Sequence, residues 1–225
     1  MADAPPATTE TPDALISADD GRAYWQSIDA DVQGMLGGFA YISRADLQGS
    51  RAFLAKLGIG AKSGLRTVAR ILEGGAGIGR ITEGLLLDVA SHVDVVEPIA
   101  KFTEKLAARP DVSVTNVGLE EWVPEDQTTY NVIWNQWCVG HLTDEQLVAY
   151  LRRCRSALAP DGFIVVKENQ SSSGADIFDD VDSSVTRTDE KFREIFKQAG
   201  LSLIKTEPQH GFPKTIMPVR MYALR

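Results

Sequence analysis

From Leu65 onward, short apolar runs rich in β-branched residues alternate with amphipathic stretches of helical period. This alternation is typical of β-α-β units arranged around a mostly parallel sheet. Five strands are predicted, at residues 67–72, 93–96, 112–115, 131–135 and 163–167. We therefore expect an α/β fold whose helices pack on the faces of this sheet.

The order of elements changes after the fifth predicted strand. A Ser/Asp-rich segment, 169–187, leads to a predicted helix at 189–199 that Gly200 ends. Two more strand candidates follow at 201–206 and 219–224, with a short connection that contains proline and glycine. Such a connection suits an antiparallel hairpin better than a right-handed crossover. The expected architecture is a seven-stranded, mostly parallel, Rossmann-like sheet that ends in an antiparallel hairpin.

Local signals mark two of the connecting helices. Pro98 can occupy the first turn of one helix, and Thr143 with Gln146 forms the pattern of a capping box at the start of another. Cys154 falls on the apolar face of this second helix. A buried packing role is therefore expected for Cys154 rather than a role as a nucleophile.

The N-terminal part of the chain has a different character. Residues 1–20 are rich in Pro, Ala, Thr and Asp and hold few large apolar groups, so ordering them recovers little burial energy. We predict a disordered tail there. Residues 21–64, with a short helix at 50–57, are predicted to form a cap over the active site of a single domain that covers 21–225.

Composition and charge exclude several classes of protein. The chain has 225 residues, a formal net charge of −8 and 44% hydrophobic residues, which is the profile of one ordinary globular domain. The acidic balance argues against binding to a phosphate backbone, and no apolar stretch is long enough to cross a bilayer. The two cysteines form neither a disulfide framework nor a zinc motif. We expect a soluble protein of the cytoplasm, and possibly of the nucleus, that needs no metal.

The segment from Glu73 to Arg80 holds the clearest chemical signal. It follows the first predicted strand, opens a helix and reads Glu-x-Gly-x-Gly-x-Gly. This spacing differs from the dinucleotide fingerprint, because Arg80 stands where that pattern needs its third glycine. Glu97 ends the second strand, where a carboxylate can accept hydrogen bonds from ribose hydroxyls. The pattern resembles the first motif of S-adenosylmethionine-dependent methyltransferases; a glycine-rich turn without a ligand is the alternative.

Longer strings extend this resemblance to a particular family. Residues 134–144 read W-x-Q-W-x-x-G-H-L-T-D and residues 179–184 read D-D-V-D-S-S. Together with the glycine loop they closely resemble the eukaryotic protein N-terminal methyltransferases, over about residues 24–225. That family methylates the α-amine of proteins that begin Xaa-Pro-Lys or Xaa-Pro-Arg. Met217 departs from the pattern, because animal members carry a channel-lining tyrosine near this position.

The resemblance implies a role for each of three groups of residues. The expected cofactor contacts are Gly75, Gly77, Arg80, Glu97, Leu119, Glu120 and Gln136. The expected substrate contacts are Trp25, Leu36, Gly37, Trp137, Asp179 and Ser184. The expected catalytic residues are Asp182 and His141, as proton acceptors, and Asn169, which would hold the α-amine. Trp122 and Trp134 are expected to be core residues.

The implied reaction is methyl transfer from S-adenosylmethionine to protein N-termini that begin Xaa-Pro-Lys/Arg, to the di- or trimethyl stage. No nucleic acid, membrane or metal takes part in it, and a monomer is expected. Two alternatives stay open on the sequence. One is a methyltransferase that acts on a small metabolite, and the other is a non-catalytic, cofactor-binding partner subunit.

Overall fold

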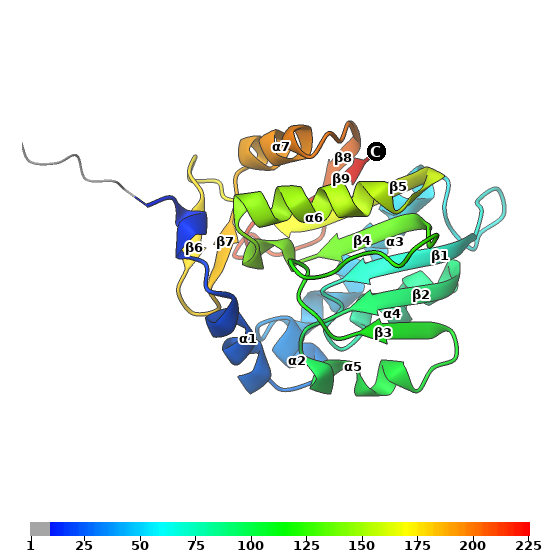
Figure 1. Cartoon of the computed structure of the whole chain (residues 1–225), viewed down its shortest axis with the longest axis horizontal. Coiled ribbons are helices and arrows are strands. Elements are labelled where there is room, and N and C mark those ends of the chain that lie inside the picture. The colour runs from blue at the N-terminus through cyan, green and yellow to red at the C-terminus, as the bar shows by residue number, and fades with distance from the viewer. Residues whose placement is uncertain (1–9) are drawn as a thin grey trace, which may run out of the picture.

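A seven-stranded sheet forms the centre of the computed structural model, which describes residues 10–225 (Figure 1). The strands lie in the order β3-β2-β1-β4-β5-β9-β8. Their bounds are β1 Val68–Gly74, β2 Ala90–Val96, β3 Val112–Thr115, β4 Tyr130–Gln136, β5 Leu158–Asn169, β8 Leu203–Pro208 and β9 Val219–Leu224. The first five are mutually parallel, whereas β9 is antiparallel to both β5 and β8. The predicted fold class is confirmed.

Helices cover both faces of the sheet, as Figure 1 shows. The α-helices are α1 Ala18–Ser27, α2 Val32–Met35, α3 Ser43–Lys56, α4 Arg80–Gly84, α5 Ala100–Ala107, α6 Asp144–Ser156 and α7 Asp189–Gln198. Four short 3-10 helices are η1 Pro12–Leu15, η2 Ala40–Ile42, η3 Leu86–Asp88 and η4 Val139–His141. Side chains of α6 and α7 share one buried cluster with the sheet, and side chains of α3, α4 and α5 share the other.

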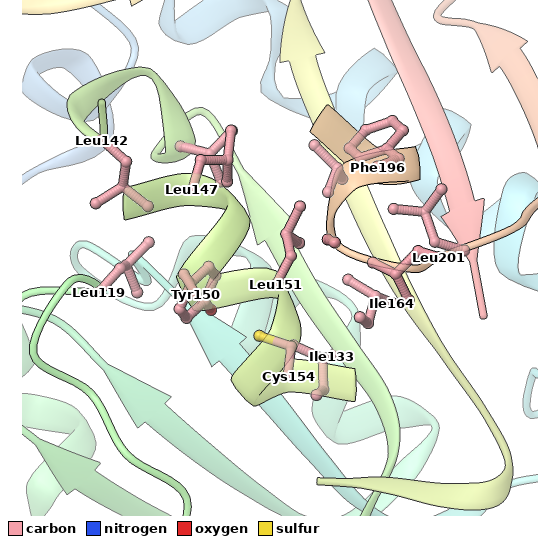
Figure 2. Close-up of a cluster of buried hydrophobic side chains, with 14 of the residues drawn as sticks. Leu119, Ile133, Leu142, Leu147, Tyr150, Leu151, Cys154, Ile164, Phe196 and Leu201 are labelled. Atoms are coloured by element: carbon pink, nitrogen blue, oxygen red, sulfur yellow. The ribbon is translucent and has the colours of Figure 1, made fainter. Parts of the chain in front are cut away.

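Alternation along the strands divides the core between these two faces. On β4, Ile133 belongs to the cluster under α6, whereas its neighbours Val132 and Trp134 belong to the opposite cluster. Figure 2 shows Ile133 near Leu151 and Cys154 of α6. Cys154 is fully buried, so the expectation that it is a core residue is confirmed.

The local helix signals are confirmed with one change of boundary. The Thr143 N–H donates to Gln146 Oε1 (2.9 Å) and the Gln146 N–H donates to Thr143 Oγ1 (3.2 Å), which completes the capping box. Helix α5 begins at Ala100, after Pro98 rather than with it. The Ile99 N–H donates instead to the side chain of Glu97, which precedes the helix.

A small second sheet was not predicted. Strands β6 (Ile177–Asp179) and β7 (Ser184–Thr186) pair in antiparallel fashion within the Ser/Asp-rich segment. In the register of the pair, Asp179 lies opposite Ser184. Strands of three residues are too short to produce a visible alternation of apolar and polar positions.

The prediction of a disordered tail is wrong over residues 10–20; the rest of that segment, 1–9, lies outside the described residues. Helix η1 and the start of α1 fall there, next to the β6–β7 pair (Figure 1). The Ser17 N–H donates to Ser183 Oγ (2.8 Å), and Asp13 Oδ2 accepts from the Asp144 N–H (3.0 Å). Polar contacts to distant segments order this stretch, and an argument from apolar content alone misses them.

Candidate active site

One pocket lies at the carboxyl edge of the sheet and encloses about 1050 Å³, counting its open mouth. It is lined from β1 and its glycine loop, from the end of β2, from the segments after β3 and β4, and from α1. The chain runs outward from β1 through β2 to β3, then crosses back to β4 on the other side of β1. Such a reversal of strand order is where open α/β sheets bind their ligands.

The glycine loop forms the floor of the pocket in a conformation that other residues resist. Gly75 and Gly77 have φ values of +64° and +54°. A Cβ on Gly75 would lie 2.2 Å from Cys138 Cβ, and one on Gly77 would lie 2.7 Å from Met35 Sδ. Both glycines are therefore needed for the backbone to pass under the pocket.

Glu97 closes this loop from the end of β2. Its Oε2 accepts from the Gly77 N–H (2.8 Å) and its Oε1 from the Ile99 N–H (2.9 Å). The side chain lines the pocket, and burial raises its pKa. Because a carboxylate can accept about four hydrogen bonds, Glu97 keeps acceptor capacity for a ligand.

Glu73 lines the same pocket at the end of β1 and is almost completely buried. Its Oε2 accepts from the Thr82 hydroxyl, and burial raises the pKa of Glu73 to about 8. The carboxyl group therefore holds a proton at neutral pH unless a cation approaches it. This behaviour fits a site for a ligand ammonium group.

Arg80 and Gln136 form the adjoining wall and share one partner outside the lining. Arg80 Nη1 lies 2.7 Å from Asp46 Oδ2, and Gln136 Nε2 lies 2.9 Å from each oxygen of Asp46. The Arg80 guanidinium also lies over the Trp137 ring, 5.6 Å from its centre. Asp46 was not predicted as a site residue; the signal that could have found it is an acidic residue on the buried face of α3.

Leu119 and Glu120 line the wall opposite, after β3. Leu119 is buried, while Glu120 forms an ion pair with Arg22 of α1. Arg153 of α6 donates to the main-chain oxygens of Leu119 and Glu120 (2.9 and 3.0 Å). These contacts hold Leu119 and Glu120 in place and connect them to α1 and α6.

Trp25 also lines the pocket, where it faces His141. The Trp25 indole N–H donates to His141 Nε2 (3.0 Å), so this nitrogen carries no proton. Burial lowers the pKa of His141, and the charge of Asp182 opposes that change. Among the described residues, the buried atoms His141 Nδ1, Trp137 Nε1 and Asp182 Oδ1 have no hydrogen-bond partner. Trp137 and His141 line the pocket, so their two N–H groups are available to a ligand.

The remaining predicted residues lie outside the pocket lining. They are Leu36, Gly37, Asn169, Asp179, Asp182 and Ser184. Leu36 is buried next to the lining residue Met35, and Asn169 ends β5 opposite Val219. Burial, together with the charges of Asp182 and Asp179, raises the pKa of Tyr24 on α1. The two carboxylates therefore lie near α1, and Tyr24 is a neighbour that sequence reasoning missed.

The loop that carries His141 is held from both sides by buried charged groups. Glu168 Oε1 accepts from the N–H groups of Cys138 (2.8 Å) and Val139 (3.0 Å). On the other side, Arg187, whose side chain is fully buried, donates to the main-chain oxygens of Val139 and Leu142. Neither residue was predicted as functional, although a charged residue at the end of a strand is a signal that could have identified both.

The described residues contain no group of three or more His, Cys, Asp or Glu side chains placed to hold a metal ion. None of the helices that the structure describes is both long and apolar enough to cross a membrane. The pocket is lined by the glycine loop, by the carboxylate of Glu97 at the end of β2, and by Glu73 and Arg80. These groups fit the nucleoside and the amino-acid end of S-adenosylmethionine.

Comparisons with known proteins agree with this geometry. Residues 13–225 match the family model described as AdoMet-dependent proline di-methyltransferase. The chain is 47% identical over 211 residues to alpha N-terminal protein methyltransferase 1 of Schizosaccharomyces pombe, covering 91% of this chain and 94% of the relative. It is 43% identical to N-terminal Xaa-Pro-Lys N-methyltransferase 1-A of Xenopus laevis over 208 residues, 90% of this chain and 92% of the relative.

Solved structures show the same relationship. A S-adenosylmethionine-dependent methyltransferase from Leishmania major superposes with a TM-score of 0.82 and 33% identity, over 92% of this chain and 82% of that one. A Burkholderia thailandensis methyltransferase with bound S-adenosylhomocysteine has a TM-score of 0.71 and 20% identity, over 100% of this chain and 92% of that one. At this identity the likeness shows the fold alone. The sequence resemblance is confirmed: the chain belongs to the AdoMet-dependent proline di-methyltransferase family and is an S-adenosylmethionine-dependent methyltransferase.

Proposed function

We propose that this enzyme methylates the α-amine of proteins whose exposed N-terminus begins Xaa-Pro-Lys or Xaa-Pro-Arg, to the di- or trimethyl stage. The observation that carries the proposal is that Trp25, Trp137 and His141 line the same pocket as the glycine loop and Glu97. Aromatic rings and hydrogen-bonding groups beside the cofactor residues suit an α-amine on the residue that precedes a proline. The names of the relatives in fission yeast and Xenopus support the same substrate class.

At the cofactor end, each lining residue has a distinct task. S-adenosylmethionine supplies a methyl group on a sulfonium, ready for in-line attack by an amine. Glu97 would accept from the ribose hydroxyls, and Arg80 would pair with the carboxylate of the methionine part. The remaining contacts are Gly75 and Gly77 below the ligand, Gln136 beside Arg80, and Leu119 and Glu120 at the adenine.

At the substrate end, aromatic rings and oxygens would hold an extended peptide. Trp25 and Trp137 would flank the proline ring and offer their π-faces to the cationic amine. Asn169 would accept a hydrogen bond from the α-amine. Asp179 and Ser184, which lie opposite each other across β6 and β7, would receive the basic third side chain. Leu36 and Gly37 would border the entry for the first residue.

The amine must lose a proton before each transfer. The pKa of a free α-amine is near 8, so roughly a tenth is neutral at pH 7 and a modest base is sufficient. Asp182, whose Oδ1 has no hydrogen-bond partner among residues 10–225, would accept this proton directly or through water. His141, kept neutral by burial, would accept it at Nε2 once the substrate displaces the Trp25 indole N–H from that nitrogen. A monomer in the cytoplasm, and possibly in the nucleus, remains our prediction for the state in which the enzyme acts.

Mass spectrometry of synthetic peptides tests the proposal. Ala-Pro-Lys and Pro-Pro-Lys peptides incubated with enzyme and S-adenosylmethionine should gain methyl groups on the α-amine. The same peptides with an acetylated α-amine should gain none. Methylation of small amines in place of the peptides would favour a metabolite methyltransferase instead. Cofactor binding without transfer to any peptide would point to a non-catalytic subunit.

A further inference from the structure

Asp46 of α3 is fully buried; it accepts hydrogen bonds from Gln136 and Lys167 and forms an ion pair with Arg80, and these partners lie on three other elements. Arg80 Nη1 lies 2.7 Å from its Oδ2, and Gln136 Nε2 lies 2.9 Å from both of its oxygens. Lys167 Nζ contacts its Oδ1 and its main-chain oxygen. Arg80 and Gln136 line the cofactor pocket, whereas Asp46 and Lys167 do not. Asp46 therefore stands directly behind two pocket residues.

Lys167 fixes the carboxylate from the side away from the pocket. Its ammonium is fully buried and also donates to Ser50 Oγ (2.9 Å) and Gln209 Oε1 (2.7 Å). Because these acceptors come from α3 and from the segment after β8, the ammonium is held independently of the pocket. The carboxylate of Asp46 is thus oriented before any ligand arrives.

Asp46 does not neutralise both of the cations that it contacts. Burial lowers the pKa of Lys167 to about 8, so its ammonium is charged at neutral pH. Two cations, Arg80 and Lys167, therefore face the single carboxylate of Asp46. Arg80 keeps the positive charge that a ligand carboxylate needs, and the contribution of Asp46 is to orient the guanidinium.

Orientation matters for Arg80 because an arginine side chain loses much rotamer freedom when a ligand immobilises it. A partner that restricts the side chain beforehand removes that cost from binding. Arg80 Nη1 contacts Asp46 Oδ2, and Arg80 itself lines the pocket, so the same side chain joins the buried carboxylate to the ligand site.

We propose that Asp46 is a positioning residue for the amino-acid end of the cofactor: it holds Arg80 and Gln136 in their binding orientation, and Lys167 fixes its carboxylate from the other side. The inference rests on the proposed pairing of Arg80 with the carboxylate of the methionine part. It makes no use of the peptide substrate.

The test compares two ligands that differ at the amino-acid end. S-adenosylhomocysteine carries the carboxylate, and 5′-methylthioadenosine lacks the whole amino-acid end. In titration calorimetry, Asp46→Asn should lower the affinity for S-adenosylhomocysteine by about tenfold or more. The affinity for 5′-methylthioadenosine should fall by less than about twofold. Asp88→Asn is the matched control, because Asp88 forms an exposed ion pair with Arg51 and should change neither affinity.

Two further variants separate the possible failures. Arg80→Lys should show the same selectivity as Asp46→Asn. If it weakens both ligands alike, the assignment of Arg80 is wrong. If Arg80→Lys is selective and Asp46→Asn weakens both ligands equally or neither, the role of Asp46 is refuted. Should Asp46→Asn fail to fold, Asp46→Asn with Lys167→Met removes both charges of the buried pair. This double variant should reproduce the selective loss, and unchanged binding of S-adenosylhomocysteine would overturn the proposal.

Discussion

The indole N–H of Trp25 donates to Nε2 of His141 across 3.0 Å, and the two rings meet edge to face with an interplanar angle of 84°. Trp25 belongs to α1, and His141 ends the loop that follows β4. Only a neutral imidazole offers this acceptor. The position of the N-terminal helix and the protonation of the candidate base are therefore linked.

Trp25→Phe should raise the pKa of His141, because the neutral ring loses a hydrogen bond that the charged ring cannot accept. The acid limb of the kcat/KM profile should move upward by the same amount. Proton NMR titration measures the shift directly, since the chain has three histidines and His141→Gln assigns the signal. Tyr41→Phe, at an exposed aromatic residue, is the control. An unchanged titration would show that the bond does not exist in solution.

Glu73 should release a proton when the cofactor product binds. Burial raises its pKa to about 8, so at pH 7 the free enzyme holds this proton, and a ligand ammonium nearby would favour the ionised form. Calorimetry of S-adenosylhomocysteine binding in two buffers of different ionisation enthalpy should detect release of up to about one proton. Glu73→Gln should abolish the release. Equal proton release in both proteins would assign it to another group.

The same carboxyl group should influence stability in a defined pH range. Because its folded-state pKa is raised from 4.5 to about 8, its contribution to stability is complete below the unfolded pKa and is lost as pH rises through the folded pKa. The free energy of unfolding of the wild type should therefore fall between about pH 5 and pH 8, by a few kcal/mol, relative to Glu73→Gln. Urea denaturation at both pH values checks this, and parallel curves would contradict it.

Gly75→Ala should abolish or strongly weaken cofactor binding, at least about tenfold, because its Cβ would lie 2.2 Å from Cys138 Cβ as well as at a φ of +64°. Gly58→Ala is the matched control. Gly58 has a φ of +84°, and nothing lies within 4 Å of a Cβ there. Its strain should cost about 1 kcal/mol of stability and leave binding unchanged. Equal binding losses in the two variants would mean that strain, not the close approach to Cys138, is responsible.

Arg187→Met should lower kcat by a larger factor than it lowers the affinity for S-adenosylhomocysteine. The side chain donates to main-chain oxygens of the loop that holds His141, and that loop loses its fixed geometry without it. A loss of about 3–5 kcal/mol in stability should accompany the change, since Arg187 is a buried charge with partners. Arg187→Lys should recover part of kcat. Arg193→Met is the control for loss of a positive charge, because Arg193 forms an exposed ion pair with Asp189. If Arg187→Met lowered cofactor affinity as much as kcat, the positioning role would be refuted.

Asp182→Asn should reduce turnover far more than cofactor affinity, because the amide cannot take up the proton of the amine. Turnover measured across pH, with S-adenosylhomocysteine affinity in parallel, separates the two effects. Full turnover in this variant would remove Asp182 as the base and leave His141 in that role.

The sequence predicted most of what depends on local pattern. The period of apolar residues identifies the seven strands, and single residues such as Gly200, with a φ of +75°, mark where helices end. The glycine loop and the family resemblance led to the expected cofactor contacts from Gly75 to Gln136, which line one pocket; their role as cofactor contacts stays a prediction. Asp46 and Arg187 were missed because a buried position on a helix face or a charge at a strand end marks a residue without naming its partners, and these lie far away in the chain. The order of residues 12–20 was missed for the same reason.

The four tryptophans divide evenly between core and pocket. Trp122 and Trp134 are buried core residues, in opposite clusters, as expected from the sequence. Trp25 and Trp137 line the pocket. The intrinsic fluorescence of the enzyme therefore contains a constant background from two enclosed indoles and a variable signal from two that meet whatever binds. Without any added label, the emission of the native chain can follow ligand binding in real time, and Trp25→Phe or Trp137→Phe would identify which ring reports it.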